Sequence, residues 1–182
     1  MSTKRQQTVL GFVLAGLILA GGLSEAAAEP VETWSDVSVR SSDAAMLALI
    51  DQAFAQSRTF RAMADTVRAL DGIVYIEAGH CGHGVRACLV HVMPAGKRRM
   101  LRVKVDTRKA AIDLMASIGH ELRHTIEVLG DRSVKSGFDL FFFYTREASM
   151  RTSGTFETHA AIAAGDAVRK ELREHARRLR KE

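Results

Sequence analysis

Two histidines and a glutamate stand close together in the middle of the sequence, in the segment His120-Glu121-Leu122-Arg123-His124. On a helix, the two imidazoles lie one turn apart on the same face, and both can reach one ion at about 2 Å. Glu121 lies about 100° around such a helix from His120, within reach of a water molecule on that ion. The spacing predicts a zinc site with His120 and His124 as ligands and Glu121 as general base.

A zinc site of this kind takes at least one more protein ligand, and Glu157 is the strongest candidate. A helix over 156–180 would carry Glu157 on its inward stripe, four residues before Ala161, where a buried carboxylate needs a partner. A first-turn glutamate favoured by the helix dipole is the alternative. Glu147 ranks second because the pattern does not set the direction of its helix. His159 is weaker because it points almost opposite Glu157.

Two further residues are expected to support the site. Glu127 lies on the histidine face, but about 10 Å of helix rise separates it from His120, so one straight helix cannot bring both to the same ion. We expect Glu127 to orient an imidazole or to pair with an arginine, with a solvated helix charge as the alternative. Tyr144 stands in a dense aromatic run and is a candidate oxyanion donor lining the cleft, with core packing as the alternative.

The apolar spacing predicts an α+β domain around this motif. In its first part we expect helices over 42–56 and 57–70 and strands over 73–76, 87–92 and 100–106. Ser42 and Ser57 can cap the two helices, and residues 94–97 are typical of a turn. The last two strands would then pair as a hairpin, which gives a short antiparallel sheet with one buried face.

The histidine motif falls on a long helix that begins at Asp106 or Thr107 and ends at Gly130. One face of this helix is apolar and consists of Ala111, Met115, Ile118, Leu122, Ile126 and Leu129. His120 and His124 lie on the opposite face, counting 100° per residue. We therefore expect the apolar face to pack on the sheet and the histidines to be directed away from it.

Beyond this helix, the pattern predicts a helical piece over 138–144, a loop over 149–155 and a last helix over 156–180 capped by Thr155. The end of the last helix, from Arg169 to Lys181, carries many positive charges. We expect a solvated helix face there, with weak, salt-sensitive contact to an anionic envelope surface as the alternative. Few aromatic residues accompany these charges, so no nucleic-acid partner is expected.

The first residues are typical of a secretory signal peptide. A positive Lys4-Arg5 pair precedes an uninterrupted apolar and glycine run over 9–23, and Ala26-Ala27-Ala28 fits a cleavage site. The run has about 15 residues, fewer than the roughly 20 that a spanning helix needs. We expect cleavage near Ala28 and export of the mature chain to the periplasm or the medium.

The composition is that of a globular protein. The 182 residues are 47% hydrophobic and 26% charged, which excludes collagen-like, low-complexity and wholly disordered chains. The net charge of +5 is mild and does not by itself indicate a nucleic-acid partner. We expect a signal peptide over 1–28, a flexible lead-in over 29–41 and a single domain over 42–182.

The two cysteines, Cys81 and Cys88, stand among histidines. His80, His83 and His91 could join them in a second metal cluster, but free thiolates are scarce in an oxidising, exported setting. We expect a Cys81–Cys88 disulfide that closes the loop before the second strand.

The motif resembles that of the zincin metallopeptidases. The His120–His124 segment followed by a glutamate on a later helix is similar to the gluzincin branch, and the third histidine of the metzincin pattern is missing. Residues 120–129 and 156–160 also resemble a set of uncharacterised, exported bacterial proteins, a resemblance that extends over about 57–172. It implies a small zincin-like domain whose metal is held by the two histidines and Glu157, and it implies no particular substrate.

These features together predict an exported zinc-dependent hydrolase, specifically a metallopeptidase that acts on a peptide or protein substrate. Glu121 would take a proton from the attacking water and later return it to the leaving group. The alternative is a non-catalytic exported protein whose metal site is structural or vestigial. A binding module that uses the basic C-terminal helix is a third interpretation.

Overall fold

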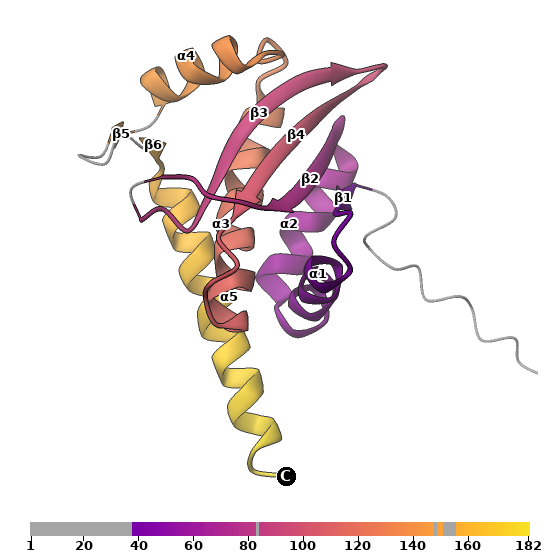
Figure 1. Cartoon of the computed structure of the whole chain (residues 1–182), viewed down its shortest axis with the longest axis vertical. Coiled ribbons are helices and arrows are strands. Elements are labelled where there is room, and N and C mark those ends of the chain that lie inside the picture. The colour runs from indigo at the N-terminus through magenta and orange to yellow at the C-terminus, as the bar shows by residue number, and fades with distance from the viewer. Residues whose placement is uncertain (1–37, 83, 148, 151–155) are drawn as a thin grey trace, which may run out of the picture. The chain divides into compact units, whose positions relative to one another are not determined.

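The computed structural model describes residues 38–82, 84–147, 149–150 and 156–182 (Figure 1). The signal peptide expected over 1–28 lies outside these residues, as does most of the lead-in expected over 29–41. Within the described part, no helix is both long and apolar enough to cross a membrane.

The described residues form an α+β fold with five helices and a small mixed sheet. The elements in chain order are β1 (Val39–Arg40), α1 (Ala44–Gln56), α2 (Arg58–Ala69), β2 (Gly72–Ala78), β3 (Ala87–Ala95), β4 (Arg98–Val105), α3 (Ala111–Gly130), α4 (Gly137–Glu147), β5 (Ser149–Met150), β6 (Phe156–Glu157) and α5 (His159–Leu179). The predicted α+β class is confirmed.

The main sheet has the strand order β1-β2-β4-β3, and the prediction that it is antiparallel is wrong. β3 and β4 form the expected antiparallel hairpin, but β4 lies between β3 and β2 and runs parallel to β2. The reason is the long connection from β2 to β3, which leaves room for the hairpin to fold back with β4 inside. β3 is therefore an edge strand.

The hairpin follows its sequence pattern closely. Leu101, Val103 and Val105 are fully buried on one face of β4, as the alternation predicts. The turn is tighter than expected because β3 continues through Ala95, and Gly96 takes a positive φ of 64° that favours glycine. The Cys81–Cys88 disulfide is present and closes the loop that leads into β3.

Three predicted helix starts are shifted. α1 is capped by Asp43 rather than Ser42, because the Asp43 carboxylate accepts hydrogen bonds from the backbone N–H groups of the first turn. α3 begins at Ala111 rather than at 106 or 107, because Asp106 binds the backbone and guanidinium of Arg108 instead of capping a helix. α5 begins at His159. The Ser57 cap of α2 is confirmed.

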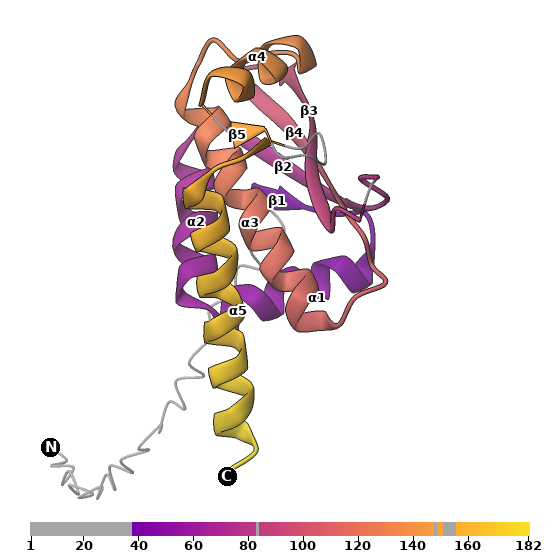
Figure 2. The same ribbon diagram turned by 90° about the vertical axis from the view of Figure 1, so that its left-hand side faces the viewer.

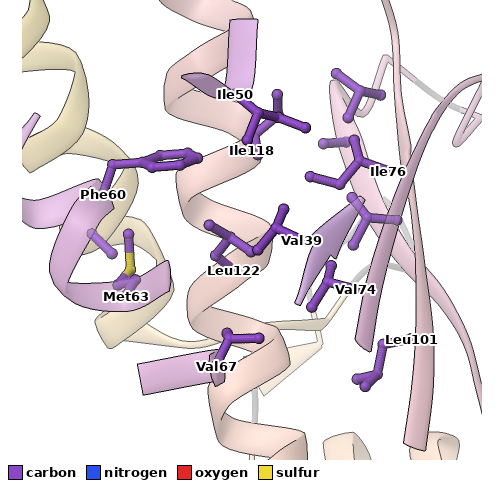
Figure 3. Packing of buried hydrophobic residues seen from close by; sticks show 14 of the residues in the cluster. Val39, Ile50, Phe60, Met63, Val67, Val74, Ile76, Leu101, Ile118 and Leu122 are labelled. Carbon is purple, nitrogen blue, oxygen red and sulfur yellow. The ribbon is translucent and has the colours of Figure 1, made fainter. Parts of the chain in front are cut away.

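α3 lies in the middle of the fold and is buried on nearly every side. Figure 3 shows Ile118 and Leu122 of α3 between Phe60 on α2 and the sheet residues Val74 and Ile76. The face of α3 that carries the histidines does not face solvent, because α5 packs along it (Figure 2). A central helix covered by other elements can hold its polar side chains in fixed positions.

Candidate metal centre

His120 and His124 lie one turn apart on α3, and Glu157 of β6 faces both of them. Oε2 of Glu157 is 3.1 Å from Nε2 of His120 and 3.8 Å from Nε2 of His124. One ligand atom from each of the three residues falls within a span of 4.8 Å. Donors arranged tetrahedrally at about 2.0–2.1 Å from a zinc ion stand roughly 3.3 Å apart. The three side chains form a group that could hold a metal ion.

Glu157 reaches this position from a strand, so the prediction that it lies on the C-terminal helix is wrong. β6 pairs with β5, where Ser149 stands opposite Glu157, and α5 begins only at His159. Thr158 caps that helix, because its hydroxyl accepts a hydrogen bond of 3.1 Å from the N–H of Ala161. Thr155, the expected cap, lies outside the described residues. The strand-to-helix junction at Thr158 therefore places the carboxylate.

The Oε2 atom of Glu157 is the carboxylate oxygen that faces the two imidazoles. Within the described residues, this atom is buried and has no hydrogen-bond partner. Burial raises the pKa of Glu157, but the imidazoles of His120 and His124 outweigh this effect and lower the pKa to about 2. An ionised, buried oxygen that lies 3.1 and 3.8 Å from two imidazole nitrogens and has no other polar partner among the described residues fits a cation between them.

Glu127 supports the site from behind His124. Its Oε2 atom lies 3.0 Å from Nδ1 of His124, and its Oε1 atom accepts a hydrogen bond of 2.8 Å from the Thr158 hydroxyl. Arg123 is 3.4 Å away. With Nδ1 bonded to Glu127, Nε2 of His124 is left to face Glu157. Glu127 is thus in contact with both an imidazole and an arginine.

The carboxylates make this region favourable for positive charge. Burial lowers the pKa of His124, but Glu127 and Glu157 more than offset this and raise the pKa to about 9. Glu121, Glu127 and Glu157 together surround two imidazoles, so a cation is the natural counterpart of the group.

Glu121 lies beside the ligand group rather than in it. Its side chain is buried, with only 4% of the residue exposed, and Oε1 is 3.9 Å from Nε2 of His120. Burial raises the pKa of Glu121, and the nearby imidazoles and a backbone hydrogen bond at Leu89 offset this only in part. A carboxyl group with a raised pKa holds a proton more readily than a solvent-exposed one, which suits a group that accepts and then passes on a proton.

Tyr144, the candidate oxyanion donor, lies next to the candidate metal-binding group. Tyr144 is buried against His124, with ring centroids 5.3 Å apart, and its hydroxyl donates to the backbone carbonyl of His124 over 3.5 Å. Burial raises the pKa of Tyr144 and keeps it protonated.

His159 is exposed at the start of α5 and is not part of the ligand group. Glu147 ends α4, and its side chain lies outside the described part of the chain.

Two adjoining cavities meet at the group of His120, His124 and Glu157. One cavity of about 400 Å³ is lined by Ser117, Arg169 and other residues of α3 and α5. A second, of about 200 Å³, is lined by Leu89 of β3, Tyr144 of α4 and Phe156 of β6. His120, Glu121 and Glu157 line both cavities, so the group stands where the two cavities adjoin.

Gly165 lies on the inward face of α5 and allows this helix to pass close to the site. A Cβ atom at Gly165 would stand 3.1 Å from Cβ of His120 and 3.3 Å from the carbonyl oxygen of Ala116. Gly119 on α3 meets Val168 of α5 just as closely. The two glycines on facing helices are the signal of this close crossing in the sequence.

Comparisons of the chain with protein-family models, with curated proteins and with solved structures give no match. The chemistry of this region is therefore argued from its own residues.

Proposed function

We propose that the chain is a zinc-dependent hydrolase, a zincin-like metallopeptidase whose ion is bound by His120, His124 and Glu157. The observation that carries the proposal is the convergence of these three side chains within 4.8 Å, with the buried Glu121 next to them. Two imidazoles and a carboxylate are a donor set that zinc takes in hydrolytic sites, with a further position left for water or substrate.

Zinc bound there would lower the pKa of a coordinated water molecule to near 7 and polarise a substrate carbonyl. Glu121 would accept the proton of the attacking water and pass it to the leaving amine. Its raised pKa suits both steps, because a strongly acidic carboxylate would hold the proton too weakly to carry it. Glu127 would hold His124 in the tautomer that leaves Nε2 for the ion.

The shape of the cleft supports a peptide substrate. β3 is the edge strand of the main sheet and contributes Leu89 to the cleft beside Glu121. An extended peptide can pair with such an edge through backbone hydrogen bonds. The two cavities that adjoin at the group would take the segments before and after the cleaved bond.

Export of the chain is part of the same proposal. The signal-peptide pattern of the first 28 residues indicates it, and the Cys81–Cys88 disulfide is consistent with an oxidising compartment. The test is expression with the natural N-terminus, fractionation of the cells and determination of the mature N-terminus.

The proposal is tested by metal analysis together with Glu121→Gln. Purified protein should contain one zinc ion per chain, and Glu121→Gln should keep the zinc and the fold while peptide hydrolysis falls by at least about 10²-fold. Glu174→Gln, an exposed glutamate on α5, is the matched control and should change neither.

The ligand set is tested separately. Glu157→Ala should weaken zinc binding strongly, whereas His159→Ala at the neighbouring exposed position should not. Loss of zinc in Glu121→Gln, or full hydrolysis by that variant, would contradict the role given to Glu121. Stoichiometric zinc with no hydrolysis in the wild-type chain would favour the alternative of a structural metal.

A further inference from the structure

One face of α4 exposes three aromatic side chains to solvent. Phe138 is 73% exposed, and Phe141 and Phe142 are each 51% exposed. The opposite face of the helix is buried and holds Leu140, Phe143 and Tyr144. The exposed rings contact one another, with centroids 4.6 Å apart for Phe138 and Phe142 and 5.6 Å apart for Phe141 and Phe142. Such a cluster on a surface typically marks a binding site.

The exposed rings continue without a break into the cleft. Phe141 lies edge-on to Phe156, with centroids 5.8 Å apart, and Phe156 stacks on Tyr144 at 5.9 Å and 12°. Tyr144 in turn contacts His124 of the ligand group. Phe156 and Tyr144 both line the smaller cavity. Both ribbon views place α4 beside β5 and β6, at the end of the fold opposite the C-terminus of α5 (Figures 1 and 2).

We propose that the exposed aromatic face of α4, formed by Phe138, Phe141 and Phe142, binds an apolar, aromatic-rich segment of a polypeptide whose continuation enters the cleft. This inference rests on the proposed function, since that polypeptide would be the substrate. Aromatic rings pair with other rings and with aliphatic side chains, and the contacts from Phe138 to His124 give such a segment one continuous apolar path.

The charges around α4 favour a peptide over an anionic membrane. Asp139, in the first turn of α4, lies beside Lys135 and accepts a hydrogen bond from its backbone N–H. Arg146, in the last turn, pairs with Asp131 at 3.2 Å. A helix that binds anionic lipid has an excess of basic residues around its apolar face, whereas acidic partners stand beside these two.

The test is peptide binding measured by fluorescence anisotropy in the Glu121→Gln background, where the probe is not consumed. The probe is a labelled peptide of about a dozen residues, one half rich in Phe and Leu and the other half Gly and Ser. A second peptide carries Ser in place of every Phe and Leu. Phe138→Ser/Phe142→Ser should bind the apolar probe about tenfold more weakly, because two large apolar contacts are lost. The polar probe should bind weakly to both proteins.

Leu179→Ser is the matched control, because Leu179 is also apolar and 58% exposed but ends α5, far from α4. It should leave the affinity for the apolar probe unchanged. Phe138→Ser alone, at the most exposed of the three positions, serves if the double variant fails to fold, and it should weaken binding about threefold.

Equal affinity of the double variant and its parent for the apolar probe would overturn the inference. So would a double variant that keeps peptide binding but loses adsorption to vesicles of phosphatidylcholine and phosphatidylglycerol, or loses a dimer seen in the parent. Failure of the two proposals can be told apart. Binding through α4 without cleavage by the wild-type chain contradicts the hydrolase, whereas cleavage that ignores the double substitution contradicts the aromatic surface.

Discussion

Two buried polar clusters adjoin α3, and they differ in whether the chain supplies all their partners. At the C-terminal end of the helix, Arg99 is only 4% exposed, and all three of its guanidinium nitrogens donate hydrogen bonds. Two of these hydrogen bonds, from Nε and Nη2, reach the carboxylate of Asp71 at 3.0 and 2.8 Å. The other hydrogen bonds reach backbone carbonyls at the end of α3 and just beyond it, those of Val128, Leu129, Asp131 and Val134.

The cluster around His120, His124 and Glu157 is incomplete by comparison. Within the described residues, Oε2 of Glu157 is buried without a hydrogen bond, and three carboxylates surround two imidazoles. A buried charge that is fully paired within the chain fixes the architecture, because Arg99 ties the end of α3 to the sheet. A buried carboxylate that faces two imidazole nitrogens and has no other polar partner among the described residues is where a ligand is expected. The contrast separates a structural cluster from a candidate metal site on the same helix.

The largest effect on stability is expected for Arg99→Met. It removes the charged partner from Asp71 and the guanidinium donors from four carbonyls near the end of α3, of which those of Val128 and Asp131 keep a backbone N–H donor. This loss should lower the free energy of unfolding by about 3–5 kcal/mol. Chemical denaturation measures this change. The folded fraction should still bind zinc with the wild-type affinity, because the ligand group lies near the middle of the helix.

Arg102→Met on the same strand is the control for this variant. Arg102 pairs with Glu77 at 2.7 Å, but its side chain is 40% exposed, so its loss should cost less than about 1 kcal/mol. If Arg99→Met and Arg102→Met lower the free energy of unfolding equally, then burial and full hydrogen bonding of Arg99 do not add to its contribution to stability. If folded Arg99→Met loses zinc, the two clusters are not separate.

A smaller effect, confined to the other cluster, is expected for Glu127→Gln. The amide cannot stabilise the His124 imidazole as a carboxylate does, so zinc affinity should fall about 10-fold to 100-fold. Competition with a chromophoric chelator measures it. Stability without metal should change far less than in Arg99→Met, since Gln keeps an acceptor for the Thr158 hydroxyl. Unchanged zinc affinity would show that Glu127 does not control the imidazole.

The candidate site was predictable where it depends on one helix and less so where it depends on the chain around it. The spacing of His120, Glu121 and His124 is a property of any helix, so their common location follows from sequence alone. Glu157 was the predicted third residue, but for a reason that does not hold, because it lies on a strand. Thr155 and Thr158 both fit a helix cap, and only the pairing of β6 with β5 decides between them.

The fold divides in the same way. Alternation in β4 and the apolar periodicity of the helices are local and were predicted. The parallel pairing of β2 with β4 was not, because it depends on where the hairpin inserts in the sheet. Arg99 was also not predicted as a core residue. Its polar type conceals that β4 turns it inward on the same face as Leu101, and its partners are far away in sequence.

The smallest expected effect concerns a polar cluster whose hydrogen bonds are all made within the chain but which is not deeply buried. It tests whether full hydrogen bonding alone makes such a cluster stabilise the fold. Glu171 of α5 is half-buried and accepts hydrogen bonds from the Ser57 hydroxyl at 2.7 Å and from the N–H and hydroxyl of Thr59 at 2.9 and 2.8 Å. Burial raises the pKa of Glu171, but these donors outweigh it and the net pKa is lowered from 4.5. Glu171→Gln should therefore lower the free energy of unfolding by about 1–2 kcal/mol at neutral pH.

The pH dependence gives the sign of this effect. A carboxyl group whose pKa is lower in the folded state stabilises the fold above its unfolded pKa, and that contribution is lost as the pH falls through the folded value. The difference in stability between wild type and Glu171→Gln should therefore be constant above about pH 4.5 and shrink below it. Glu174→Gln, exposed on the same helix, should show no such dependence. A difference as large as that of Arg99→Met would mean that complete pairing matters more than depth, and the contrast between the two clusters of α3 would then rest on pairing alone.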